Sequence, residues 1–103
     1  MSRTVRSAPD PRLELRVLGP LELRRDGRAL ELPRSRKTRA LLGYLALRSA
    51  PATRAHMCDL LWEDVADPRA NLRWSLSKLR GLADGGRWLL AEGSSLALDR
   101  TRL

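Results

Sequence analysis

The chain has 103 residues, enough for one small domain with a modest core. Hydrophobic residues make up 43% and charged residues 31% of the chain, a balance that argues against a disordered polymer. Lysine and arginine number 20 against 12 acidic residues, and the resulting net charge of +8, carried mostly by arginine, favours a nucleic-acid partner over a merely solvated basic surface.

Residues 1–12 predict a disordered lead. They contain cations but no apolar stretch after them, so they do not resemble a secretory signal. Arginine interrupts every hydrophobic run, and no window is long enough to span a bilayer. We therefore expect no membrane partner and a cytoplasmic protein associated with the nucleoid, and the single Cys58 fits a reducing compartment.

Residues 13–32 predict three short antiparallel strands. Apolar and charged residues alternate over 13–18 and again over 21–24, and Gly19-Pro20 separates the two runs. Asp26-Gly27 is a hairpin signal, and residues 29–32 predict a third strand.

Residues 35–48 predict a first helix, with Ser35 as its N-cap and an apolar stripe of Leu41, Leu42 and Leu45. Cations in its first turns oppose the helix dipole: Arg36, Lys37 and Arg39. A phosphate bound near the helix start would relieve that conflict, and solvated cations would explain it equally well.

A second helix is expected from Arg54 to Trp62, capped by Thr53 and burying Met57, Leu60 and Leu61. Thr53 and Arg54 are candidate phosphate contacts, because a helix start offers backbone N–H groups, although capping alone explains Thr53. Trp62 is expected to be a packing anchor. His56 and Cys58 are too few for a zinc site, and we expect no metal or other cofactor.

A third helix is expected over 68–82, because Asp67 can cap it and Pro68 suits its first turn. Leucines at helical spacing form one face, and the opposite face carries a tryptophan, small polar groups and cations. This is the pattern of a DNA recognition helix. Its candidate base contacts are Asn71, Trp74, Ser77 and Lys78, and its candidate phosphate contacts are Arg73 and Arg80. The alternatives are a solvated face for Asn71 and Lys78, surface salt bridges for Arg73 and Arg80, and a core position for Trp74.

Residues 87–98 predict a C-terminal hairpin, with strands at 88–91 and 95–98 around a glycine-containing turn. Arg87 at its start is a candidate minor-groove contact, and residues 100–103 are assigned to a basic tail. The order of three strands, three helices and a hairpin predicts an α+β fold, a winged helix-turn-helix over residues 13–99.

Four blocks in this order carry a family resemblance: LRVLGPLELRRDGRAL, RKTRALLGYLAL, MCDLLWED and NLRWSLSKLR. The chain resembles the winged-helix DNA-binding domain of the OmpR/PhoB type. Its nearest likeness is to the N-terminal domains of Streptomyces antibiotic regulatory protein (SARP) regulators and of regulators with a bacterial transcriptional activation domain.

The resemblance implies that the third helix enters the major groove and that the wing approaches a minor groove. It places base contacts at Asn71, Trp74, Ser77 and Lys78, and it implies head-to-tail binding to direct repeats. The loop of Glu63 and Asp64 would be available to RNA polymerase. Longer relatives continue into a C-terminal helical-repeat domain.

The sequence therefore predicts a bacterial transcriptional regulator, an activator, that binds specific double-stranded DNA. The alternative is a winged-helix protein-interaction module that has lost DNA binding. An enzyme is not expected, because one histidine and no strained Gly-x-Ser-x-Gly turn leave no set of nucleophile, base and orienting group.

Overall fold

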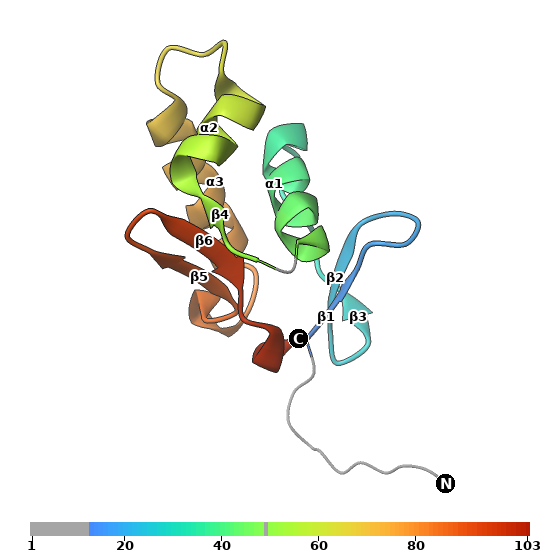
Figure 1. Ribbon diagram of the computed structural model, residues 1–103. Helices are drawn as coiled ribbons and strands as arrows, with labels where there is room; N and C mark the ends of the chain where they lie inside the picture. The colour runs from blue at the N-terminus through green and yellow to red at the C-terminus, as the bar shows by residue number, and fades with distance from the viewer. Residues whose placement is uncertain (1–12, 49) are drawn as a thin grey trace, which may run out of the picture.

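The computed structural model describes residues 13–48 and 50–103 (Figure 1). The lead predicted for residues 1–12 therefore lies outside the described residues. The described chain forms three helices and two small antiparallel sheets, which confirms the α+β winged helix-turn-helix predicted from the sequence. Within the described part of the chain, no helix is long and apolar enough to cross a membrane.

The first sheet has the order β1-β2-β3 and consists of β1 (Leu13–Arg16), β2 (Glu22–Arg25) and β3 (Arg28–Ala29). Leu13 pairs with Arg25 and Leu15 with Leu23, which turns Leu13 and Leu23 into the core. The third strand is shorter than the predicted 29–32, because its ladder with β2 spans only two residue pairs. One further bond, from the Leu30 amide to the Leu23 carbonyl at 2.8 Å, continues the hairpin beyond it.

The three helices are α1 (Arg36–Leu47), α2 (Arg54–Trp62) and α3 (Pro68–Arg80). The predicted N-caps are confirmed, because the side chains of Ser35, Thr53 and Asp67 each accept a hydrogen bond from the amide three residues on. The third helix ends two residues before the predicted position 82. Gly81 ends it, because the Gly81 amide bonds back to the carbonyls of the last turn and a turn follows.

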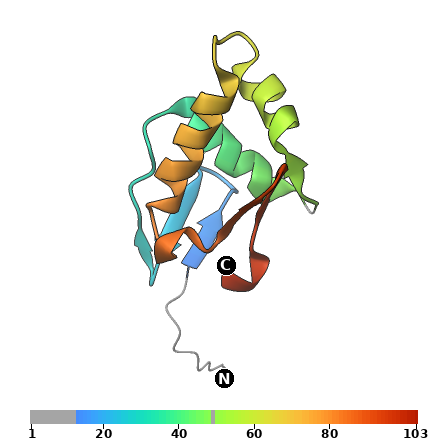
Figure 2. The ribbon, with the colours of Figure 1, turned by 90° about the vertical axis from the view of Figure 1, so that its left-hand side faces the viewer.

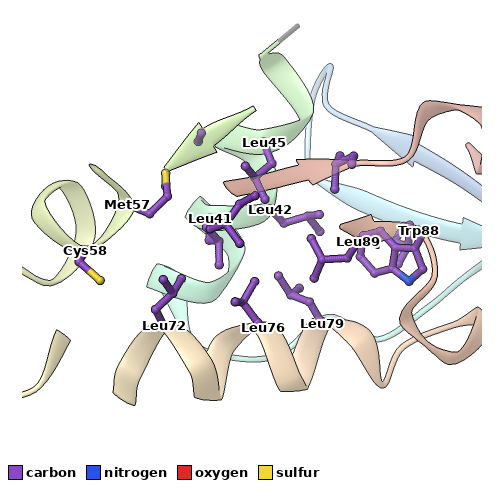
Figure 3. Packing of buried hydrophobic residues seen from close by; sticks show 14 of the residues in the cluster. Leu41, Leu42, Leu45, Met57, Cys58, Leu72, Leu76, Leu79, Trp88 and Leu89 are labelled. Atoms are coloured by element: carbon purple, nitrogen blue, oxygen red, sulfur yellow. The ribbon is translucent and has the colours of Figure 1, made fainter. Parts of the chain in front are cut away.

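The core lies where α1, α3 and the second sheet meet (Figure 3). Leucines of α1 and α3 face each other there: Leu41, Leu42, Leu45, Leu72, Leu76 and Leu79. Thr38 of α1 and Ser75 of α3 are buried among them, and their hydroxyl oxygens are 2.7 Å apart in a hydrogen bond. Trp62 is buried, as predicted, at the end of α2.

One expected core residue of α2 is exposed instead. Leu60 has half of its surface in solvent, whereas Met57 and Cys58 are buried. The buried side of α2 is centred between Met57 and Cys58, and Leu60 lies roughly a third of a helical turn away from that centre. The prediction that Leu60 is buried is therefore wrong, because it assumed that Met57, Leu60 and Leu61 all lie on the buried face of α2.

The second sheet has the order β4-β6-β5 and contains the wing. The wing strands are β5 (Leu89–Glu92) and β6 (Ser95–Leu98), close to the predicted 88–91 and 95–98. A strand not expected from the sequence, β4 (Ala52–Thr53), pairs with Leu96 and Ser95 of β6. The wing is thereby joined edge to edge with the segment that leads into α2 (Figure 1).

Two short 3₁₀ helices complete the fold, η1 (Asp84–Gly86) after α3 and η2 (Arg100–Arg102) after the wing. The residues assigned to a basic tail thus include a turn of helix. The Arg100 guanidinium donates to the carbonyls of Leu45 and Ala46 at the end of α1, at 3.1 and 3.0 Å, and also to that of Arg48.

Hydrogen bonds from the Thr101 hydroxyl and amide, with the nearby Arg102 charge, lower the pKa of Asp99.

Candidate nucleic-acid interface

Helix α3 divides cleanly into a buried and an exposed side. The buried side holds Leu72, Ser75, Leu76 and Leu79, and the candidate base and phosphate contacts on the helix are all exposed. Figure 2 looks onto the face of the molecule on which α3 and the wing lie together. The core thus fixes which side of α3 faces solvent.

Trp74 is exposed over 51% of its surface, which excludes the core position weighed as its alternative. The Lys78 ammonium nitrogen lies over its indole ring, 5.3 Å from the ring centroid. A cation over an aromatic face is attracted by the ring quadrupole, so Trp74 restricts where the Lys78 charge is held. The pair presents one apolar ring and one cation to solvent, side by side.

Asn71 and Ser77 are exposed on the same helix. The Asn71 amide nitrogen donates to the Asp67 carbonyl at 2.9 Å, which leaves its second proton free to donate to adenine N7 and its oxygen free to accept from the adenine N6 amino group. Because Asn71 and Lys78 are seven residues apart, they lie two turns apart on nearly the same side of the helix.

Arginines line the other border of the exposed side. Arg73 follows Arg69 by four residues and Arg80 follows Arg73 by seven, so the three arginines lie in one row along the helix. Helix α3 contains no acidic residue, and no ion pair joins any of its four cations to a carboxylate among the described residues. A row of arginines without carboxylate partners is suited to binding phosphates.

Gly86 sets the position of one of these arginines. Its backbone has φ +80°, and a Cβ built on it would lie 2.7 Å from both Cβ and Cγ of Arg80. The aliphatic stem of Arg80 therefore packs directly on the glycine backbone. A side chain at position 86 would be strained, and it would also displace Arg80.

The start of α2 is bonded to the tip of the wing. The Arg54 amide donates to the Ser94 carbonyl, and Arg54 Nε donates to the Gly93 carbonyl, both at 2.8 Å. Thr53 Oγ1 accepts from the His56 amide at 3.0 Å. Two of the first three N–H groups of α2 are thus already used, which leaves the Arg54 guanidinium as the main donor for an anion there.

The wing itself is poor in charge. Residues 88–98 contain Glu92 and no cation. Arg87 is exposed, but it lies at the base of the wing, before β5 begins. Arg54, from another element, therefore supplies the cation at the wing tip.

The loop between α2 and α3 exposes Glu63 and Asp64, the residues predicted to face RNA polymerase. Asp64 lies 3.7 Å from the Lys37 ammonium on α1, and 81% of its side chain is exposed. An ion pair at such exposure is weak, so the carboxylate remains available to a partner. Among the described residues, no group of three or more His, Cys, Asp or Glu side chains could hold a metal ion.

Two features of this surface and one of the core beneath it are not predicted from the sequence. Arg69 was overlooked, although its spacing of four from Arg73 was a usable signal. The bond from Arg54 to the wing joins residues 39 positions apart, and the buried Thr38–Ser75 pair joins residues 37 positions apart. Patterns of neighbouring residues in the sequence do not predict contacts between residues so far apart in the chain.

No protein-family model and no curated protein sequence matches this chain. Among solved structures, the chain is similar to EmbR of Mycobacterium tuberculosis, solved in complex with a low-affinity phosphopeptide. The TM-score is 0.72 at 28% identity, over 86% of this chain and 25% of EmbR. The chain therefore spans about a quarter of the length of that protein.

The architecture and the exposed helix together define a winged helix-turn-helix domain. More particularly, its fold is that of the winged-helix DNA-binding domain of EmbR, a SARP-family regulator. The match confirms the resemblance to SARP-type winged helices drawn from the sequence.

Proposed function

We propose that this chain is the DNA-binding domain of a bacterial transcriptional regulator and that it recognises specific double-stranded DNA. The observation that carries the proposal is the exposed side of α3, where four cations and a tryptophan face solvent without a carboxylate partner among the described residues. The similarity of this chain to EmbR supports the same function.

In this proposal α3 lies in the major groove. Lys78 donates to guanine, Asn71 pairs with adenine, and Trp74 contacts the methyl group of thymine, with Ser77 between them. Two bidentate or near-bidentate contacts and one apolar contact are enough to distinguish a short half-site from random sequence.

The phosphate backbone contributes most of the affinity. The arginine row of α3, now including Arg69 beside Arg73 and Arg80, runs along one strand. Arg54, with the Thr53 hydroxyl, binds phosphate where the wing meets α2. Arg87 lies at the base of the wing, near the minor groove.

The proposal extends to assembly and activation. Copies bind head-to-tail on direct repeats, and the loop of Glu63 and Asp64 contacts RNA polymerase, as the family resemblance implies. The family resemblance implies a C-terminal helical-repeat domain in longer relatives, and the site of action that fits the proposed function is the nucleoid in the cytoplasm.

Selection of bound DNA from a random pool tests the function. We expect an enriched motif, repeated at a spacing of about one helical turn, with specific affinity about 10³-fold or more above that for shuffled DNA. A pool that gains affinity without any shared motif would contradict sequence-specific recognition. Absence of binding even at low salt would contradict the proposal as a whole and favour the protein-interaction alternative.

A further inference from the structure

An open apolar groove of about 520 Å³ lies between α1 and the loop that joins β1 to β2. Its walls include Val17 and Leu21 from that loop and Leu47 from the end of α1. Leu47 is 75% exposed, and Leu18, beside Val17, is 93% exposed. Exposed leucines beside an open apolar groove make this surface a candidate contact site for another molecule.

Gly43 lines the groove from the middle of α1. Glycine weakens a helix interior more than any residue except proline. A Cβ built on Gly43 would meet no atom within 4 Å, and its φ is not in the left-handed region, so neither packing nor backbone conformation within the described chain requires glycine. Ala40 lies about one turn before Gly43 and also lines the groove. Because both residues are small, another molecule can approach the backbone of α1 closely at this point.

The charge at the groove points to an acidic occupant. Arg36 and Arg39 line it and are exposed, and neither is ion-paired with a carboxylate among the described residues. No acidic residue lines the groove. The N-terminal residues 1–12 carry three arginines and one aspartate, so their charge disfavours them as its occupant.

We propose that this groove binds an acidic amphipathic helix of a protein partner, with apolar side chains against Val17, Gly43 and Leu47 and carboxylates beside Arg36 and Arg39. A helix that lays its apolar face into a groove is a common mode of peptide recognition. A flat membrane would cover the protruding Leu18 and Leu47 but would not reach the recessed wall at Gly43. In Figure 1 the β1–β2 loop, which borders the groove, lies to the right of α1, whereas the wing and α3 lie to its left. The proposed partner and DNA would therefore bind on different sides of α1.

The test uses the full chain and a fluorescent designed peptide of about 14 residues, with leucine at helical spacing and glutamate elsewhere. Fluorescence anisotropy should show saturable binding. Gly43→Leu should weaken it by about tenfold or more, because the new side chain fills the groove while leucine favours the helix. Arg36→Gln with Arg39→Gln should weaken it similarly. Leu47→Ala should weaken it, and Leu60→Ala, which trims a leucine on a different helix, should not.

Several outcomes would overturn the proposal. Equal affinity of all variants, or equal binding of a peptide with lysine in place of glutamate, would show that the groove does not select an acidic helix. Binding of anionic phosphatidylglycerol vesicles that Gly43→Leu leaves unchanged, without peptide binding, would indicate a membrane surface instead. DNA affinity of Gly43→Leu, measured in parallel, should be unchanged, so this result is separable from the fate of the proposed function.

Discussion

At the scale of single residues, the most consequential contact is the one between Trp74 and Lys78. The tryptophan is large for the centre of a DNA-reading surface, and its ring beneath the lysine ammonium explains how it can be accommodated there. The ring holds the cation in place and also presents an apolar edge of its own. A single side chain thereby affects both of the base contacts proposed for this pair.

Trp74 and Lys78 should therefore act as a unit in DNA binding. Lys78→Ala should cost about 1–3 kcal/mol at the selected site and little on random DNA. The double variant, Lys78→Ala with Trp74→Ala, should lose less binding free energy than the two single variants lose together. The difference should be about 0.5–1 kcal/mol, because the cation–π contact is lost only once. Affinities measured by anisotropy test this, and strictly additive losses would show that the ring does not position the lysine.

The hydroxyl pair of Thr38 and Ser75 predicts an effect on stability rather than binding. Thr38→Val keeps the shape but leaves the buried Ser75 hydroxyl without its partner, which should cost about 1–3 kcal/mol in urea unfolding. Adding Ser75→Ala removes the orphaned group, so the double variant should lose less than the two single variants together. Additive losses would mean that the two hydroxyls find other partners.

At the scale of elements, the sequence predicted local structure well and long-range contacts poorly. Caps are local, because a side chain bonds an amide three residues on, so Ser35, Thr53 and Asp67 could be recognised directly. Helical spacing likewise separated the two sides of α3. The prediction that Leu60 is buried was wrong because α2 has only nine residues, which are too few for helical spacing to distinguish between neighbouring faces.

The contacts that complete the interface could not be predicted in the same way. The two-residue strand β4 has no alternation of its own, and it exists because β6 provides a partner more than 40 residues later. The groove beside α1 depends on how a loop of the first sheet folds toward that helix. Such features follow from tertiary packing, to which local patterns are blind.

The bond between α2 and the wing predicts a coupled effect of Arg54. Arg54→Ala should weaken binding to all DNA sequences and speed amide exchange in the turn at residues 93–95, because the wing tip loses one of its two bonds to α2. Arg54→Lys keeps the charge but not the guanidinium geometry. It should recover part of the affinity while exchange stays fast. Unchanged exchange in both variants would show that the side chain does not hold the wing.

The hydrogen bonds of Arg100 to the end of α1 predict an effect on stability. Arg100→Ala removes the donor to three carbonyls there and should lower the free energy of unfolding by about 1 kcal/mol. Arg102→Ala is the matched control, because the Arg102 ion pair with Asp99 is surface-exposed and should matter little. Equal effects of the two variants would argue against a capping role for Arg100.

At the scale of the whole molecule, a net charge of +8 attracts any polyanion, so total charge and the proposed interface must be separated. Arg73→Gln and Arg28→Gln each remove one charge, but Arg28 lies on β3 of the first sheet and not on α3. Arg73→Gln should reduce the slope of log affinity against log salt by about one, and Arg28→Gln should leave it unchanged. Equal changes in slope would indicate diffuse attraction instead of defined phosphate contacts.

The edge-to-edge pairing of β4 with β6 has a consequence for how binding energy is used. The wing and the start of α2 are one hydrogen-bonded unit, and α3 is fixed to α1 by a close-packed core. The distance between the reading helix and the wing is thus set before any duplex arrives. A rigid template of this kind loses little entropy on association, so in the proposed complex the duplex would adjust its own groove width and curvature to the protein. Sequences that deform easily at the bases between the two contacts should then be preferred, even where no side chain touches them.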